Sequence, residues 1–390
     1  MAIGLGASLN TARDVKLARA VTSGLVLKSN FDTGAVTPIS DGSVSLSGAS
    51  DQHVACGTGM PDVTSGTFTI SGWYRIESGH DVNTDGKLTF FSRGVGAGTS
   101  GYYMKYEKSG ANYRFILFQA KSGGYNSISH NVTLSPGTWY HIVWVNGGTG
   151  AVSSFYLDGV QVETKTLSQD ILTAADVSFK IGISSALLEE WKGNICNVGM
   201  WTSTLTSAQI KSIMYKNYSG LTSSEKTNLV SWWNLDEVVD SNNLHVADLA
   251  NDTLGATALT NGDFSSGDFT GWTAGGPPAG AEVVSHDGHR TAAHITTSSN
   301  DHGYNQNVLT AGQVYKVSFD IKVISGSMYL GKDGTQVGGV DYTDSSWTSY
   351  THYWTAPDTY FRIYSEIASS EFYIDNISVQ PTNGNYGTLS

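Results

Sequence analysis

The sequences NGDFSSGDFTGW at Asn261–Trp272 and EFYIDNISV at Glu371–Val379 decide the fold of the C-terminal part of the chain. The second sequence has apolar residues at alternate positions, as a half-buried strand does, but the phase of the alternation changes at Asp375-Asn376. Because one extra residue moves the following side chains to the opposite face of a strand, this change predicts a β-bulge there.

Other segments carry equally local strand signals. Residues Tyr315–Val323 alternate strictly between apolar and polar side chains, which predicts a strand with one buried face. Phe68–Ile76 predicts another strand, and Trp139–Val145, which is apolar on both faces, predicts a central one. The sequence SFYLDGVQV at Ser154–Val162 predicts a hairpin, because its Asp-Gly pair suits the positive φ angles of a type I′ turn.

Helix signals are few and short. Thr206 with Gln209, and Thr222 with Glu225, have the spacing of a capping box. We therefore expect two brief helices on a body that consists mainly of strands.

The composition agrees with a β-rich protein of two or three domains. The chain has 390 residues, with 45 Gly, 7 Pro, 39% hydrophobic residues and only 14% charged residues. The net charge of -12 disfavours nucleic acid as a partner, and it disfavours acidic polysaccharides unless a local patch overrides the mean. No apolar run approaches the length of about 18 residues that a spanning helix needs, so membrane insertion is not expected.

Cys56 and Cys196 are the two cysteines of the chain. Two buried free thiols are the simpler interpretation, and a single disulfide is the alternative. Their spacing in the sequence does not decide between them.

Several segments of the N-terminal part resemble, in content and order, the concanavalin A-like laminin-G/pentraxin group. They are FTISGWYRI, GTWYHIVWV, FYLDGVQV, FKIGI, WKGNICNVGMW followed by LTSAQI, and LVSWWNLDE. The resemblance covers about residues 25–246 and implies a sandwich of two antiparallel sheets.

The opening and closing segments of the C-terminal part resemble those of carbohydrate-binding modules of the CBM4/9 type, over about residues 259–380. This resemblance implies a β-jelly roll. We therefore expect an all-β chain with two antiparallel β-sandwich (jelly-roll) domains. An N-terminal arm at 1–24, a linker at 247–258 and a Gly/Asn tail at 381–390 complete the expected organisation.

The sequence offers no carboxylate pair with the spacing that retaining glucanases of the concanavalin A-like fold use. Glu189 and Glu190 are adjacent and would face opposite sides of a strand, and Asp236, Glu237 and Asp240 stand in the wrong order. We therefore expect a protein that is not an enzyme.

Four histidines cluster in the second module, and we interpret them as solvated loop residues rather than metal ligands, because a metal site needs converging side chains. They are His286, His289, His294 and His302.

Sugar binding needs aromatic faces beside hydrogen-bonding groups, and turn-rich segments of the second module supply both. The candidates are Tyr304, Tyr329, Tyr342, Trp347 and Gln306. Trp272 is expected in the core. In the first module, Tyr102, Tyr103 and Tyr125 are expected to pack in the core or at the rim, with a concave binding face as the alternative.

Modules of the resembled family commonly hold a structural calcium ion between the first and last strands. The resemblance assigns Asp263 and Asp375 as its carboxylate ligands. A bulge at Asp375 would also free backbone carbonyls, and calcium takes six to eight oxygen ligands. The alternative is that Asp263 caps a turn and Asp375 hydrogen-bonds the bulge.

Residues 1–24 contain Arg13, Lys16 and Arg19 and no apolar stretch of the kind found in secretion signals. We expect this segment to dock onto capsid or tail proteins, in a homo-oligomeric phage virion appendage that binds host or environmental glycans. The alternatives are a secreted bacterial polysaccharide-binding or glucanase-accessory protein, and a purely structural decoration protein without sugar binding.

Overall fold

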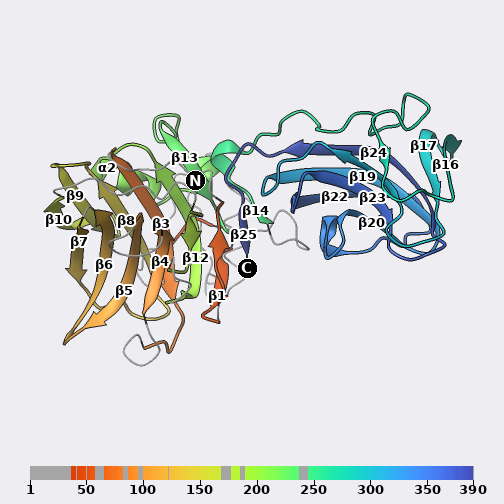
Figure 1. The fold of residues 1–390 in the computed structure, drawn as a ribbon. Helices are drawn as coiled ribbons and strands as arrows, with labels where there is room; N and C mark the ends of the chain where they lie inside the picture. The colour runs from red at the N-terminus through yellow and green to blue at the C-terminus, as the bar shows by residue number, and fades with distance from the viewer. Residues whose placement is uncertain are drawn as a thin grey trace, which may run out of the picture. The chain divides into compact units, whose positions relative to one another are not determined.

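The computed structural model describes residues 37–40, 42–49, 51–57, 66–81, 87–94, 100–121, 123–167, 177–184, 189–236 and 245–389 (Figure 1). All described residues after Thr37 belong to one compact unit, Pro38–Ser390, and the expected arm at 1–24 lies outside the described residues. About 51% of the described residues are in strands and 5% in helices, which confirms the all-β class.

The N-terminal sandwich consists of two antiparallel sheets. The first sheet runs in the order β1 (Val44–Ser47), β12 (Lys192–Trp201), β3 (Phe68–Ile76), β8 (Trp139–Asn146), β9 (Val152–Leu157) and β10 (Val160–Thr166), with β13 (Leu229–Trp233) paired to β12. The second runs β14 (His245–Val246), β25 (Gly387–Leu389), β2 (Val54–Ala55), β11 (Lys180–Ile181), β4 (Leu88–Arg93), β5 (Tyr102–Ser109), β6 (Asn112–Lys121) and β7 (Gly124–Asn131).

Side chains from both sheets form the core of this sandwich. Phe68 of β3 meets Trp144 of β8 edge-to-face at 4.4 Å, and Phe91 of β4 lies parallel to the same tryptophan. The predicted strand over residues 68–76 is confirmed without change. The predicted hairpin is also confirmed, since Asp158 and Gly159 between β9 and β10 have φ angles of 49° and 75°.

Both cysteines are buried and free, which confirms the simpler of the two interpretations. Burial raises the pKa of the Cys196 thiol to about 12. Both thiols therefore act as small apolar core groups.

One of the two capping boxes begins an α-helix. Thr206 and Gln209 cap helix α2 (Ser207–Ile213) reciprocally, and Ile210 and Ile213 bury its apolar face. The short 3₁₀ segment η1 (Tyr218–Gly220) follows.

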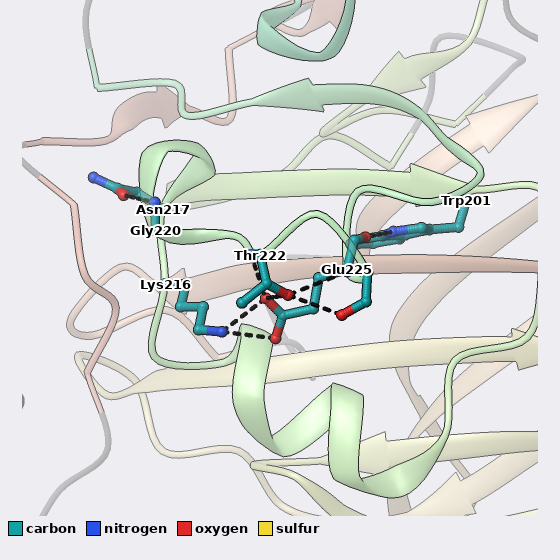
Figure 2. A network of polar contacts seen from close by, with 7 residues as sticks. Trp201, Lys216, Asn217, Gly220, Thr222 and Glu225 are labelled. Carbon is teal, nitrogen blue, oxygen red and sulfur yellow. Dashed lines mark hydrogen bonds and ion pairs between the residues drawn. The ribbon is translucent and has the colours of Figure 1, made fainter.

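The second predicted helix is wrong. Thr222 and Glu225 do make the reciprocal capping contacts, but the chain continues as turns and reaches β13 through Asn228 at a φ of 61°. Figure 2 shows the Glu225 carboxylate receiving two hydrogen bonds from Lys216 Nζ, both at 2.7 Å, while the Glu225 carbonyl accepts the Trp201 indole N–H. The capping geometry here holds a loop against β12 instead of starting a helix.

The C-terminal sandwich also has two antiparallel sheets. One runs β15 (Thr273–Ala274), β18 (Gly303–Asn307), β23 (Tyr360–Ser365), β20 (Met328–Lys332) and β21 (Thr335–Gln336), followed along the chain by η3 (Val337–Gly339). The other runs β16 (Gly280–His286), β17 (His289–Thr296), β24 (Glu371–Pro381), β19 (Val314–Ser325) and β22 (Thr348–Thr355).

The alternation predicted for Tyr315–Val323 is confirmed, because the apolar residues of β19 are buried and the polar ones are not. The predicted bulge is confirmed as well. Ser318 pairs with Ser378 and Asp320 with Asp375, so β24 contains one extra residue, and Asn376 has a φ of 52°.

The opening segment is fixed against the closing strand at this bulge. Ile377 N–H donates to the Gly262 carbonyl at 2.9 Å, and Trp272 stacks on Phe264 in the core, as expected for Trp272. The indole N–H of Trp272 donates to the Asn261 carbonyl. The two segments that decide the fold therefore meet in space.

Residues 381–389, which were expected as a tail, are paired along most of their length. Gly255 N–H donates to the Pro381 carbonyl, and Leu254 bridges to Thr382, so the expected linker and tail run antiparallel to each other. Strand β25 then lies between β14 and β2 and completes a sheet of the N-terminal sandwich. The expected linker and the expected tail, hydrogen-bonded to each other, thus both connect the two sandwiches.

Among the described residues, no helix combines the length and the apolar character that crossing a membrane requires.

Candidate functional site

A row of polar and aromatic side chains crosses the outer face of the sheet formed by β16, β17, β24, β19 and β22. Glu282 pairs with His294, His294 with Tyr373, and Tyr373 with Lys322. Cross-strand partners share one face of a sheet. Their chain neighbours such as Ile374 are buried in the core, so this row faces outward.

Tyr373 lies at the centre of a ring stack. The imidazoles of His286 and His294 lie nearly parallel to its phenol ring, with centroids at 3.9 and 4.3 Å. His294 and Tyr373 are cross-strand partners, so their parallel rings stand side by side on the sheet, whereas His286 reaches Tyr373 from β16, beyond β17. The stack brings imidazole nitrogen atoms and a phenol hydroxyl group together on the outer face of this sheet.

Trp347 extends this surface from the loop before β22. Its ring stacks on His289 at 3.8 Å and lies 6.3 Å from Tyr373. Trp347 is half-buried, and its indole N–H makes no hydrogen bond to any described residue. We call Trp347, Tyr373 and the three stacked histidines the ring cluster.

Carboxylates hold the imidazoles of the ring cluster in place. His289 Nδ1 lies 2.8 Å from Asp375 Oδ2. His294 lies between Glu282 and Glu371, at 3.2 and 3.0 Å.

Lys322 and Tyr373 contribute further polar groups to the same face. Lys322 Nζ donates to Asp287 at 2.5 Å, and this hydrogen bond lowers the pKa of the Asp287 carboxyl. Burial, followed by the charges of Glu371 and Glu282, raises the pKa of Tyr373, so the phenol stays protonated near neutral pH. The face thus combines stacked rings with hydrogen-bond donors and acceptors.

Trp347 is the one predicted sugar-binding residue that lies in the ring cluster. Tyr342 is buried, and its hydroxyl donates to the Val337 carbonyl at 2.8 Å. Tyr329 is buried as well, and its hydroxyl donates to Asp301. As folded, neither tyrosine offers a ring face to a ligand, contrary to the expectation of a cleft.

Gln306 and Tyr304 have structural contacts. The Gln306 side chain accepts from the Thr260 N–H and donates to the Thr260 carbonyl, which fixes the start of the module. Tyr304 is half-buried and stacks on Phe269 at 4.1 Å.

Tyr373 was not predicted as a site residue, and three histidines were predicted in loops. His286, His289 and His294 belong to strands β16 and β17 and not to loops. His302 does lie outside a strand, with Nδ1 2.9 Å from the Pro277 carbonyl. The local signal for Tyr373 was its outward parity, and a single strand cannot connect that residue to partners far away in the sequence.

The two predicted calcium ligands have protein partners. The Asp263 carboxylate accepts hydrogen bonds from the Ser265 N–H and hydroxyl groups. Asp375 contacts His289 and accepts the Asn376 N–H at 2.7 Å. Within the described part of the chain, no three His, Cys, Asp or Glu side chains are grouped to hold a metal ion. Each of the two carboxylates thus has a protein partner as placed, and calcium at this seam stays a prediction.

Two of the carboxylates considered for hydrolysis have structural partners, and one of them is Asp236, which accepts from the Ser40 hydroxyl at 3.4 Å. Glu189 is ion-paired with Lys87 and Lys105. Glu237 and Asp240 lie outside the described residues.

Two family models match the chain. Residues 47–211 match the model described as the concanavalin A-like lectin/glucanases superfamily, and residues 256–379 match that of a carbohydrate-binding domain. The chain therefore contains a concanavalin A-like domain and a carbohydrate-binding module. No curated protein matches the sequence.

Three solved structures are similar to parts of the chain. The heptameric SAP-like pentraxin from Limulus polyphemus is 16% identical over 44% of this chain and 80% of its own, with a TM-score of 0.34. Domain 4 of an extracellular arabinanase from Geobacillus stearothermophilus is 20% identical over 44% of this chain and 76% of its own, with a TM-score of 0.33. A xylan-binding domain from Paenibacillus barcinonensis is 16% identical over 33% of this chain and 97% of its own, with a TM-score of 0.27.

Proposed function

We propose that the carbohydrate-binding module binds a polysaccharide on the ring cluster and does not hydrolyse it. The observation that carries this proposal is the row Glu282–His294–Tyr373–Lys322, flanked by Trp347. Sugar rings have apolar C–H faces and polar hydroxyl groups around the rim. Trp347 supplies an apolar surface, and the stacked rings and carboxylates supply hydrogen-bonding groups.

The ring cluster is rigid enough to bind without large ordering costs. Its imidazoles are stacked on neighbouring rings, and two of them are held by carboxylates at 2.8 to 3.2 Å. Pre-ordered side chains lose little conformational entropy when a ligand arrives. Affinity per site is expected to be weak, with several copies supplying avidity.

Affinity electrophoresis on a panel of neutral and acidic polysaccharides tests this proposal. We expect retention of the unmutated protein on at least one polysaccharide, and at least tenfold weaker retention for Trp347→Ala and Tyr373→Ala. Tyr360→Ala removes a 38% exposed aromatic ring from the other sheet and serves as the matched control. No retention on any polysaccharide, or equal retention of all variants, would refute the proposal.

The absence of hydrolysis is tested on the same polysaccharides. We expect no release of reducing ends by the full chain. Release that one carboxylate substitution abolishes would show that the protein is an enzyme.

We further propose that the chain is a homo-oligomeric phage virion appendage, attached to capsid or tail proteins through residues 1–24. The support is the contrast between Arg13, Lys16 and Arg19 and a chain with a net charge of -12. Deleting residues 1–24 should lower occupancy on particles while glycan retention persists. Full occupancy of the truncated protein would place the attachment elsewhere, and attachment to particles without any glycan retention would favour a purely structural decoration protein.

A further inference from the structure

The outer face of β5, β6 and β7 in the concanavalin A-like domain carries a second aromatic surface. Alternate residues of these strands, such as Met104 and Leu117, are buried in the core, so the residues between them point outward. Tyr103 pairs with Phe118, and Phe118 with Ser127, in one cross-strand row.

Three rings of this face contact one another. Tyr103 stacks on Phe118 at 5.0 Å, and Tyr125 meets Phe118 at 5.2 Å with its plane tilted by 68°. Tyr125 is 51% exposed, whereas Tyr103 and Phe118 are half-buried. Tyr102, considered together with them in the sequence, is a core residue. The exposed ring of Tyr125 therefore packs against Phe118, which in turn stacks on Tyr103.

A buried ion network stabilises the strands under these rings. Lys105, which is 6% exposed, contacts Glu107 and Glu189, each at 3.2 Å. Arg114 contacts Glu107 at 2.7 Å, and Lys87 contacts Glu189 at 3.1 Å. Burying charges is costly unless they are paired, so these groups are interpreted as a scaffold and not as ligand contacts.

An exposed lysine lies beside the aromatic surface. Three cations of the scaffold share two carboxylates, and Lys165 of the neighbouring β10 adds an exposed ammonium group that donates to the Ser127 carbonyl at 2.6 Å. Glu163, also on β10, lies with its carboxylate 3.8 Å from His130 Nδ1. Because Ser127 is the cross-strand partner of Phe118, the Lys165 ammonium lies at the edge of the aromatic surface.

We propose that this face is a second saccharide site, for a sugar that bears a carboxylate. The apolar side of the sugar ring packs on Tyr125 and Phe118, and its carboxylate accepts from the Lys165 ammonium. The site lies in a different domain from the ring cluster, so it stands independently of the function proposed above.

The test uses the full chain and immobilised acidic polysaccharides: polygalacturonate, alginate, hyaluronate and polysialic acid. We expect retention on at least one of them, weakened at least tenfold when its carboxylates are reduced to alcohols. Tyr125→Ala and Lys165→Gln should each weaken that retention at least fivefold. Retention should also fall as salt rises from 50 to 300 mM, because screening weakens ion pairs.

Matched control variants distinguish binding at this face from binding elsewhere on the chain. Tyr215→Ala and Lys332→Gln remove side chains of the same types with 46% and 50% exposure at other places, and they should leave retention unchanged. Trp347→Ala removes the tryptophan of the ring cluster and should also leave retention on the acidic polysaccharide unchanged. Binding lost only in Trp347→Ala, equal binding of the carboxyl-reduced polysaccharide, or no binding to any of the four would overturn the proposal. Unchanged melting temperatures of Tyr125→Ala and Lys165→Gln exclude unfolding as the cause of a loss.

Discussion

The carboxylate of Asp248 accepts the backbone N–H of Asn385 at 2.9 Å, across 137 positions of the sequence. Asp248 is completely buried and also accepts from the Trp232 N–H and the Ser231 hydroxyl. The indole of Trp233 in turn donates to the Asn385 carbonyl at 2.8 Å. The last residues of the chain are therefore part of the N-terminal sandwich, although the carbohydrate-binding module lies between them in sequence.

Asp248→Asn should destabilise the N-terminal sandwich by about 2–4 kcal/mol, because an amide nitrogen would face N–H and O–H donors that need an acceptor. Urea unfolding followed by tryptophan fluorescence measures this change. The exposed Asp333→Asn is the control and should change stability by less than about 0.5 kcal/mol. Equal stability of the two variants would show that the Asp248 contacts contribute little.

Gly387→Ala should lower the same stability, by about 1–3 kcal/mol, because a methyl group there would lie 2.6 Å from both Val54 and Val246. Gly66→Ala is the matched control, since its added methyl group meets no atom within 4 Å. Calorimetry on both variants measures the difference. If Gly387→Ala melts as the control does, β25 is not tightly packed between β2 and β14.

The N-terminal sandwich should lose stability in mild acid because of His141. Burial lowers the pKa of His141 to about 3, from an ordinary value of 6.5, and the Ser71 hydroxyl lies 2.8 Å from its Nε2. A group whose folded pKa is lowered contributes stability that is complete above pH 6.5 and is lost as pH falls toward 3. The loss approaches about 1.4 kcal/mol for each pH unit in that window.

Melting temperatures measured between pH 7 and pH 4 test this dependence. His141→Gln cannot be protonated in this range, so its stability should fall less steeply with pH than that of the unmutated protein. Parallel pH profiles of the two proteins would assign the acid sensitivity to other groups, such as the half-buried carboxylates.

Local signals predicted the strands well because they depend on neighbours in the sequence. The alternation of Tyr315–Val323 and the capping box at Thr206 are of this kind, and the structure contains both. The capping box at Thr222 also formed, but long-range contacts decided what followed it. Lys216 holds the Glu225 carboxylate, and the chain must turn at once into β13.

The site residues were predicted poorly because burial is a property of the whole fold. Tyr342 follows a turn-rich segment, yet an isolated bridge to Met328 brings it into the core. His294 and Tyr373 are 79 positions apart and meet only through the pairing of β17 with β24. No spacing rule within a single strand could have connected them.

Calcium at the seam between Asp263 and Asp375 remains a prediction from the family resemblance. An ion at Asp375 would have to displace His289, which lies 2.8 Å from the carboxylate. Calcium should then raise the melting temperature of the full chain, and His289→Ala should bind the ion more tightly. An unchanged melting temperature with chelator, together with no calcium in elemental analysis, would leave the His289–Asp375 pair as the structural contact.

Tyr342 distinguishes a core role from a sugar-binding role. Its ring is 2% exposed and meets Phe319 edge-to-face at 5.1 Å, and its hydroxyl donates to the Val337 carbonyl. Tyr342→Ala should therefore destabilise the carbohydrate-binding module by about 3–5 kcal/mol through loss of a large buried side chain. Tyr342→Phe retains the ring and should cost only about 1 kcal/mol, the net value of one hydrogen bond. Because Tyr342→Phe leaves the fold intact, its retention on polysaccharide should equal that of the unmutated protein. A marked loss of retention in Tyr342→Phe with an unchanged melting temperature would instead place this hydroxyl in contact with the sugar.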